Sequence, residues 1–513
     1  MRIKHISVVV VLLLLSFILP VAPATGQFSG GTEGNHDPAG VGYRATPNVV
    51  DGFRENTVEV DVEGAAIHGG GRPAFPNRVV GDFGAIGGGE GNLAGDRATV
   101  SGGSLNQASG FRSSVGGGSN NIAQGEHSTV SGGSNNAASA TRSTISGGCY
   151  NTASHLDATI GGGAGNVASY SHATVGGGTR NTASSLDATV SGGSNNLASG
   201  AYATVSGGAS NLASGFSAVV GGGSGNTASA SNTALSGGLG NRISDHYSTV
   251  GGGVGNTAGN RNEDPGDAQY STVSGGIDNT AAGLGSTVGG GGNSVARGSY
   301  STIPGGFQNH ADSHYAFAAG SRANIHASHP GAFLYADSTD NHFDSKAANE
   351  FAVRATGGVR FVTGINLLGI PTAGVRLEAG SSSWSYMSTR NMKTNLSFVE
   401  GKQVLQKLFN VPILAWNYRD QTPSIQHMGP LAEDFFAAFG LGEDEKFINA
   451  VDVDGVALVA IQGLYQLVRE QEDQIMAQRR RILLLENEKA TQQEQIATLE
   501  ARVSKIEQGI GSK

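Results

Sequence analysis

The sequence feature that most constrains the fold is a fifteen-residue period in the middle of the chain. In each period an aliphatic residue stands before a Gly-Gly pair, either directly or with one serine between them, and an asparagine follows six places after it. The aliphatic residues are Val100, Val115, Val130, Ile145, Ile160, Val175, Val190, Val205, Val220, Leu235 and Val250. Such repetition predicts a stacked-repeat architecture, because each unit leaves an apolar edge that the next unit covers.

The residues within one unit predict that the repeats form a β-solenoid. Residues 188–200 read Ala-Thr-Val-Ser-Gly-Gly-Ser-Asn-Asn-Leu-Ala-Ser-Gly, so a short β-favouring triplet alternates with glycine and asparagine turn residues. Less regular units extend the array at Ile86, Val273, Val288 and Ile303. We therefore expect the solenoid to cover residues 86–312. The segment 260–267 adds eight residues to one period, and we expect it to form a surface loop. The repeated asparagines are expected to form a hydrogen-bonded ladder inside the rod.

A single coil of fifteen residues has few large apolar side chains, so a lone chain is expected to bury little surface. Three chains packed side by side would bury more. The repeats resemble the left-handed β-roll heads of trimeric autotransporter adhesins, and this resemblance implies a homotrimer. We predict a mainly β fold: a trimeric β-solenoid with an N-terminal β region at 25–85 and a β-rich neck at 313–380. A small α/β domain and a helical coiled coil are expected to follow.

The N-terminus has the pattern of a secretory signal peptide at residues 1–24. Arg2 and Lys4 precede an apolar core at 8–19, and Ala-Pro-Ala at 22–24 is a small-residue cleavage site. An uncleaved membrane anchor is the alternative interpretation of the same segment. We expect a secreted or cell-surface protein without a later membrane span. Cys149 is the only cysteine, so no intrachain disulfide can form.

The composition argues against several classes of partner. The net charge is −9 and no basic stripe is present, which argues against nucleic-acid binding. The glycine-rich segments lack the Gly-Lys-Ser/Thr that a phosphate-binding loop needs. We expect no cofactor and no metal. A cell-surface or glycan ligand for the rod stays open, although no aromatic platform or paired carboxylates are evident in the sequence.

Beyond a joint at 381–383, the chain becomes richer in aromatic, charged and helix-favouring residues. A long helix is predicted at its end, because two series of residues repeat every seven positions. The first series is Ile461, Val468, Ile475, Ile482, Lys489, Ile496 and Val503. The second series is Leu464, Gln471, Gln478, Leu485, Gln492, Leu499 and Ile506. This spacing predicts a left-handed coiled coil at 457–508. A single amphipathic helix on a globular core is the alternative.

The segment before that helix carries motifs in a distinctive order. A serine and a lysine five positions apart, Ser388 and Lys393, are followed by Trp-Asn-Tyr at 416–418, Gly-Pro-Leu-Ala-Glu-Asp-Phe at 429–435 and Asp-Val-Asp-Gly-Val at 452–456. Residues 384–475 resemble the intramolecular chaperone auto-processing family of phage endosialidases and tail fibres. The resemblance implies a domain at 384–456 that trimerises, helps the preceding fibre to fold and then cuts the chain. It also implies that Ser388 is the nucleophile, Lys393 the general base and Met387–Ser388 the scissile bond.

The chemistry of this pair is plausible on general grounds. A serine hydroxyl needs a base to remove its proton, and lysine is an established partner for that step. Attack on the preceding peptide bond needs no bound substrate, because the chain itself supplies the proximity. Five positions do not align two side chains on one helix face, so the pair must meet at a loop–helix junction or across subunits. The family has aspartate where this chain has Thr389. A non-cleaving fibre whose last domain is a permanent trimerisation clamp is therefore the alternative.

Overall fold

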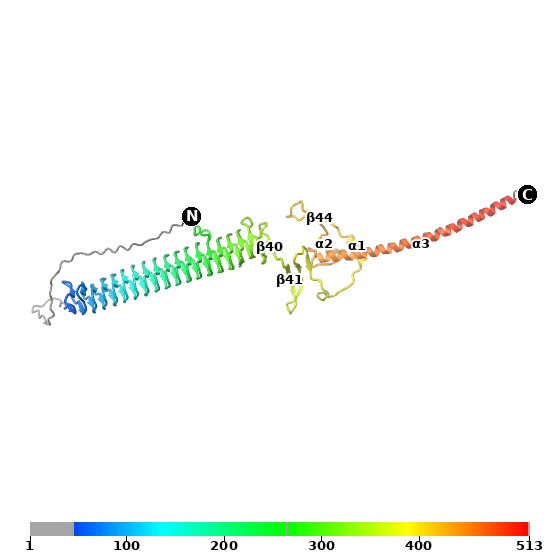
Figure 1. Cartoon of the computed structure of the whole chain (residues 1–513). Helices are drawn as coiled ribbons and strands as arrows, with labels where there is room; N and C mark the ends of the chain where they lie inside the picture. Colours follow the sequence, from blue (N-terminus) through cyan, green and yellow to red (C-terminus); the bar gives the residue numbers. More distant parts are fainter. Residues whose placement is uncertain (1–45, 263, 511–513) are drawn as a thin grey trace. The chain divides into compact units, whose positions relative to one another are not determined.

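The structure, a computed structural model, describes residues 46–262 and 264–510 and contains two compact units (Figure 1). The first unit extends to Arg360 and includes residues 376–385. The second consists of residues 361–375 and the chain from Tyr386 onward. The predicted signal peptide at 1–24 lies outside the described residues. The fold is mainly β, with a parallel β-solenoid and one long C-terminal helix.

The solenoid consists of two rows of short parallel strands. The first row runs from β1 (Val49–Asp51) to β40 (Phe351–Arg354), and the second from β2 (Thr57–Val58) to β39 (Phe343–Asp344). A typical coil contributes β19 (Thr189–Val190) to the first row and β20 (Leu197–Ala198) to the second. Val190 pairs with Val205 of the next coil, and Ala198 pairs with Ala213. The fifteen-residue period therefore sets the stacking register, as the sequence predicts.

Each coil closes its own core with side chains from one chain. Ala188, Val190, Asn196 and Ala198 are all buried, and the same positions are buried in nearly every regular coil. A lone chain thus buries these core positions by itself, although it was expected to bury little surface. Small and β-branched side chains form this interior, whereas Leu239, Val254 and Ile277, at stacked positions of successive coils, stay exposed on the surface.

The buried asparagines form the predicted ladder. The Asn181 side-chain amide donates to the carbonyl oxygens of Gly177 and Gly193 at 2.8 and 2.9 Å. Its own oxygen accepts a 3.0 Å hydrogen bond from the backbone N–H of Asn196 in the next coil. Each asparagine thus joins successive coils and satisfies backbone groups that would otherwise be buried without partners.

The second glycine of the Gly-Gly pair is required by a close approach between coils. Gly193 has φ of +89°, and a Cβ built on it would lie 2.1 Å from the carbonyl oxygen of Gly208. Only glycine combines that conformation with that space. Gly192, one position earlier, has open space where its Cβ would be.

The solenoid is longer than the strict period indicates. Its first coils pair Val50 with Ile67 and Ile67 with Ile86, and a late pair joins Leu334 to Ala352. Residues 49–85 and 313–354, expected in the N-terminal β region and the neck, therefore belong to the stack. Unequal coil lengths are tolerated because extra residues leave the stack as loops. The insertion at 260–267 is such a loop, since Val250 still pairs with its equivalent in the next coil.

A three-stranded sheet of β41 (Val359–Ile365), β42 (Pro371–Leu377) and β43 (Trp384–Tyr386) follows the solenoid. The remaining elements are the 3₁₀ turn η1 (Arg390–Met392), α1 (Gly401–Phe409), β44 (Leu414–Trp416), β45 (His427–Gly429), α2 (Ala432–Phe439) and α3 (Ala450–Ile510). The strands β44 and β45 pair antiparallel.

The second unit has a small core of its own, made by Val404, Phe435, Val456 and Ala460. These residues come from α1, α2 and the start of α3. By length and composition alone, α3 is apolar enough to cross a membrane. Its first turns pack against α1 in this core, and 17% of its apolar window is buried.

Candidate functional site

The structure brings Ser388 and Lys393 together within one chain. The Lys393 Nζ donates to the Ser388 Oγ at 2.7 Å. The 3₁₀ turn η1 makes this contact possible: Met392 N–H donates to Thr389 O and Lys393 N–H to Arg390 O, both at 3.1 Å. The turn reverses the chain so that residues five apart meet. Of the two arrangements left open by the sequence, the described chain has the loop–helix junction.

The Met387–Ser388 bond lies at the entrance to this turn. Met387 directly follows β43, and its N–H donates to the Gly374 carbonyl of β42 at 3.4 Å. One side of the bond is thereby held by the sheet and the other by the turn. Because the Ser388 hydroxyl belongs to the residue whose peptide bond would break, no separate substrate needs to be positioned.

The separation of Lys393 and Ser388 suits proton transfer. A general base must be about 2.6–3.2 Å from the group that it deprotonates. The same separation serves a hydrogen bond in the opposite direction, in which the hydroxyl donates to a neutral amine. Both side chains are exposed in the single chain. A lysine works as a general base when burial or a nearby positive charge favours its neutral amine. The single chain provides the required distance between Lys393 and Ser388 but leaves both side chains in contact with water.

Thr389 occupies the N-cap position of η1. Its backbone is extended, with φ −81° and ψ 148°, as an N-cap requires, but its side chain makes no capping hydrogen bond. Residue 389 is thus a position where a carboxylate could accept a hydrogen bond from the turn.

The other motif residues have structural roles. The Asn417 amide donates to the carbonyl oxygens of Pro423 and Ile425 and so ties the loop between β44 and β45. The rings of Trp416 and His427 stack at 4.7 Å. Glu433 and Asp434 lie in the first turn of α2, where negative charge favours the helix dipole.

The heptad residues of α3 form an exposed apolar seam. With Ile461 at position a and Leu464 at position d, these side chains are 63% and 52% exposed, and Ile506 at the far end is 58% exposed. The seam is distinct from the face covered by α1, which contacts the helix at Val456 and Ala460. α3 therefore has one apolar face that is covered within the chain and one that is not.

The solenoid carries an exposed aromatic column that the overall composition conceals. Tyr247 stacks on Tyr270 with ring centroids 5.2 Å apart, and Tyr300 stacks on Tyr315 at 5.8 Å. In the regular coils these residues stand twelve places after the buried aliphatic residue. Tyr202 occupies the same place on an earlier coil. Assigning every aromatic residue to its place in the period would have revealed this column from the sequence.

Within residues 46–262 and 264–510, no group of three or more His, Cys, Asp and Glu side chains is arranged to hold a metal ion. No protein-family model matches the chain, and no curated protein matches it either. The resemblance to the auto-processing family stays a prediction that rests on the order of the motifs.

Proposed function

We propose that this chain is a secreted homotrimeric fibre or adhesin-like protein with a C-terminal intramolecular chaperone. In this proposal the chaperone trimerises the chain and self-cleaves before Ser388 with a Ser388–Lys393 dyad. The observation that carries the proposal is the 2.7 Å contact between these side chains, beside the bond expected to break. Secretion is supported by the signal-peptide pattern at 1–24.

The exposed seam of α3 supports trimerisation. A row of β-branched and leucine side chains repeating every seven residues is the pattern that coiled coils bury between helices. Long repetitive strand arrays are prone to pair out of register, because every coil resembles its neighbours. A helical bundle that gathers the chains would give every solenoid the same starting point. Cleavage afterwards would make assembly irreversible.

The proposed reaction uses atoms of this chain and one water molecule. The neutral Lys393 amine takes the proton from Ser388 Oγ, and that oxygen attacks the carbonyl carbon of Met387. The C–N bond breaks, the Ser388 nitrogen receives the proton from the lysine, and an ester joins Met387 to the serine oxygen. Water then hydrolyses the ester and leaves a carboxylate on Met387 and a free amine on Ser388.

Burial of the dyad by the other subunits fits this scheme. The Lys393 side chain is exposed to solvent in the single chain. A neighbouring subunit that removes water from this site would favour the neutral amine. Cleavage would then begin only after the trimer has formed.

The test compares the full chain with a Ser388→Ala variant by denaturing electrophoresis and intact-mass analysis. We expect the unmodified chain to give a C-terminal fragment that begins at Ser388, and the variant to stay whole. Lys393→Met is the companion variant, because it keeps the length of the side chain and removes the amine. Uncut protein in every sample would contradict the protease and leave the second interpretation, a fibre with a permanent clamp. The uncapped Thr389 favours that alternative.

A ligand-binding role for the rod is a further candidate function, and the exposed tyrosine column favours it. The stacked pairs Tyr247–Tyr270 and Tyr300–Tyr315, which are separated by Gly285, present exposed aromatic surface that can pack against the apolar faces of sugar rings. A glycan-array screen of the full chain beside a Tyr300→Ala/Tyr315→Ala variant tests this role. Binding that is unchanged by the double substitution would exclude the column as the ligand site.

A further inference from the structure

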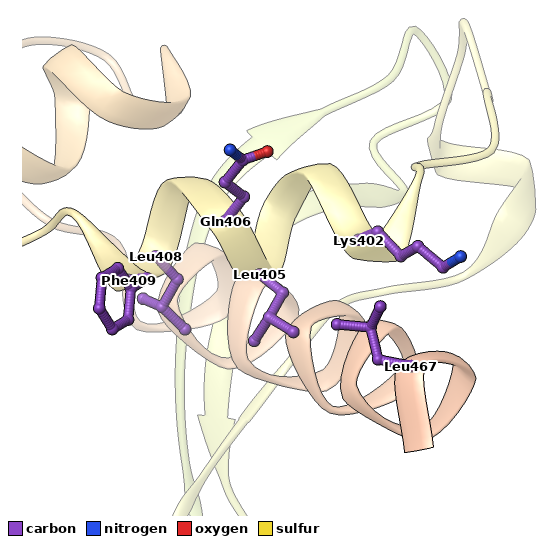
Figure 2. A pocket seen from close by; sticks show the side chains of 6 residues that line it. All are labelled: Lys402, Leu405, Gln406, Leu408, Phe409 and Leu467. Carbon is purple, nitrogen blue, oxygen red and sulfur yellow. The ribbon is translucent and has the colours of Figure 1, made fainter. Parts of the chain in front are cut away.

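An open apolar groove lies along the junction of α1 and α3 (Figure 2). Its volume is about 630 Å³, and the residues that line it are Lys402, Leu405, Gln406, Leu408, Phe409 and Leu467. Lys402 is the one charged residue in this lining, and it forms an ion pair with Glu470. The groove therefore has no unpaired charge to offer a ligand. A pocket on the solenoid differs in this respect.

The solenoid pocket lies where the eight-residue insertion at 260–267 leaves the stack. Its volume is about 420 Å³, which is within the range of small-molecule sites. Asn260 and Arg261 line it from the root of the insertion. From the next two coils, whose strands β30 (Thr280–Ala281) and β32 (Val295–Ala296) pair with each other, the lining residues are Thr280, Ala282, Val295 and Arg297.

Hydrogen bonds from the preceding coil hold the root of the insertion in place. Asp245 is 1% exposed, and its carboxylate accepts from the backbone N–H groups of Asn260 at 3.0 Å and Ala268 at 3.3 Å. These two residues flank the insertion, so one buried carboxylate holds both of its ends. The Arg261 N–H donates to the Ser244 Oγ at 3.2 Å. The Arg261 side chain therefore extends from a fixed backbone position at the pocket.

The two arginines of the pocket have hydrogen-bond donors to spare. The Arg261 Nη2 donates to Thr257 Oγ1, a neutral hydroxyl, and within residues 46–262 and 264–510 this guanidinium has no carboxylate partner. The Arg297 Nη1 donates to both oxygens of Asp312, at 2.9 and 3.1 Å. The Nε and Nη2 donors of Arg297 have no partner in the same part of the chain. Guanidinium groups with free N–H donors match the planar geometry of a carboxylate.

The carboxylates around the root of the insertion are occupied by other groups. Asp312 pairs with Arg297, and Asp267 accepts from the side-chain amides of Asn260 at 2.8 Å and Asn262 at 2.6 Å. Asp245 accepts the two backbone N–H groups described above. Arg261 is thus a fixed cation whose charge no carboxylate in the described part of the chain neutralises. An anionic ligand would supply the missing charge.

The rest of the lining defines what kind of anion fits. Ala282 and Val295 are apolar, and the Thr280 hydroxyl has no hydrogen-bond partner among the described residues. A ligand for this pocket therefore combines a carboxylate with an apolar face and hydroxyl groups. We propose that the pocket binds a carboxylated sugar of the uronic acid class. The carboxylate pairs with Arg261 and Arg297, the apolar face of the sugar ring packs on Val295, and Thr280 bonds a ring hydroxyl.

This site belongs to a single chain, so it rests neither on the proposed trimer nor on self-cleavage. It also differs from the tyrosine column, because its specificity comes from charge. Saturation-transfer difference NMR on the full chain tests it with glucuronate as the probe. Glucose has the same ring without the carboxylate, and we expect its Kd to be at least about tenfold higher. Inorganic phosphate at equal concentration should not displace glucuronate. Equal binding of glucose, or full displacement by phosphate, would overturn the carboxylated-sugar site.

Variants of the full chain locate the binding. Arg261→Gln removes the unneutralised charge and should raise the Kd for glucuronate at least about tenfold. The matched control is Arg180→Gln, an exposed arginine outside the pocket with a similar left-handed backbone, φ +55° against +62° for Arg261. We expect the control to bind normally. Thr280→Val keeps the shape of the side chain and should raise the Kd about threefold.

Circular dichroism verifies that each variant keeps the β signal of the solenoid. A Kd that is unchanged in both Arg261→Gln and Thr280→Val would overturn the pocket. Binding that is lost in the Tyr300→Ala/Tyr315→Ala variant but kept in Arg261→Gln would also overturn it and would assign the sugar to the tyrosine column. Each of these results leaves the trimer and the cleavage reaction to their own tests.

Discussion

The solenoid core and the helix α3 differ in how far a single chain buries their apolar side chains. In the solenoid, Val190 and Ala198 are completely buried within a single chain. In α3, the apolar residues Ile475 and Ile482 are about half exposed, at 49% and 54%. The difference teaches that the rod carries the information for its own stacking, while α3 exposes apolar residues that the proposed association would bury.

The largest expected effect comes from placing a charge in the seam. Ile475→Asp puts a carboxylate at a position that the proposed bundle buries, and an unpaired buried charge costs several kcal/mol. We expect the full chain to lose its oligomeric state in sedimentation equilibrium. Its β signal in circular dichroism should remain, because the solenoid closes its own core.

Met476→Asp is the matched control for this substitution. It adds the same charge one residue later, on the outer face of the helix, and should leave assembly unchanged. If Ile475→Asp also removed the β signal, the solenoid would depend on association. The contrast between the two regions would then fail.

A smaller effect is expected from the Gly-Gly pair of a central coil. Gly193→Ala forces a Cβ against the Gly208 carbonyl of the next coil and should lower the free energy of unfolding by about 3 kcal/mol. Gly192→Ala has open space and should change it by less than about 0.5 kcal/mol. Guanidinium unfolding followed by circular dichroism measures both. Equal effects would mean that the close approach between coils does not limit stability.

The sequence predicted the regular coils better than the irregular ones, for a physical reason. A constant spacing such as that from Val190 to Val205 makes the stacked position visible. Ile67 and Ile86 stack equally well but are nineteen residues apart, and the spacing from Leu334 to Ala352 is eighteen. Strand pairing fixes only the stacked residues and leaves the length of the loop between them free. A search by period alone therefore misses the ends of the solenoid.

The candidate site, like the solenoid, was only partly predictable from the sequence. The motif order pointed to Ser388 and Lys393, and their spacing excluded one helix face but left a loop–helix junction and a contact across subunits open. The 3₁₀ turn that joins them depends on backbone geometry that residue types do not specify. The groove beside Leu467 was not predictable, because it depends on how far α1 extends along α3. Residue pattern thus suggested the proposed chemistry, and packing determined the surfaces around it.

The smallest expected effect concerns Thr389, which caps η1 without a side-chain hydrogen bond. Thr389→Asp offers the turn a better acceptor, and a gain of about 0.5 kcal/mol would raise the rate of cleavage about twofold. The rate is measured as fragment yield over time after refolding. Thr389→Asn offers the same kind of acceptor without the charge. Equal increases would assign the effect to capping, and an increase with aspartate alone would assign it to the carboxylate charge beside Lys393. No increase with either variant would contradict a role for residue 389 in holding the dyad, and the turn would then be set by its backbone alone.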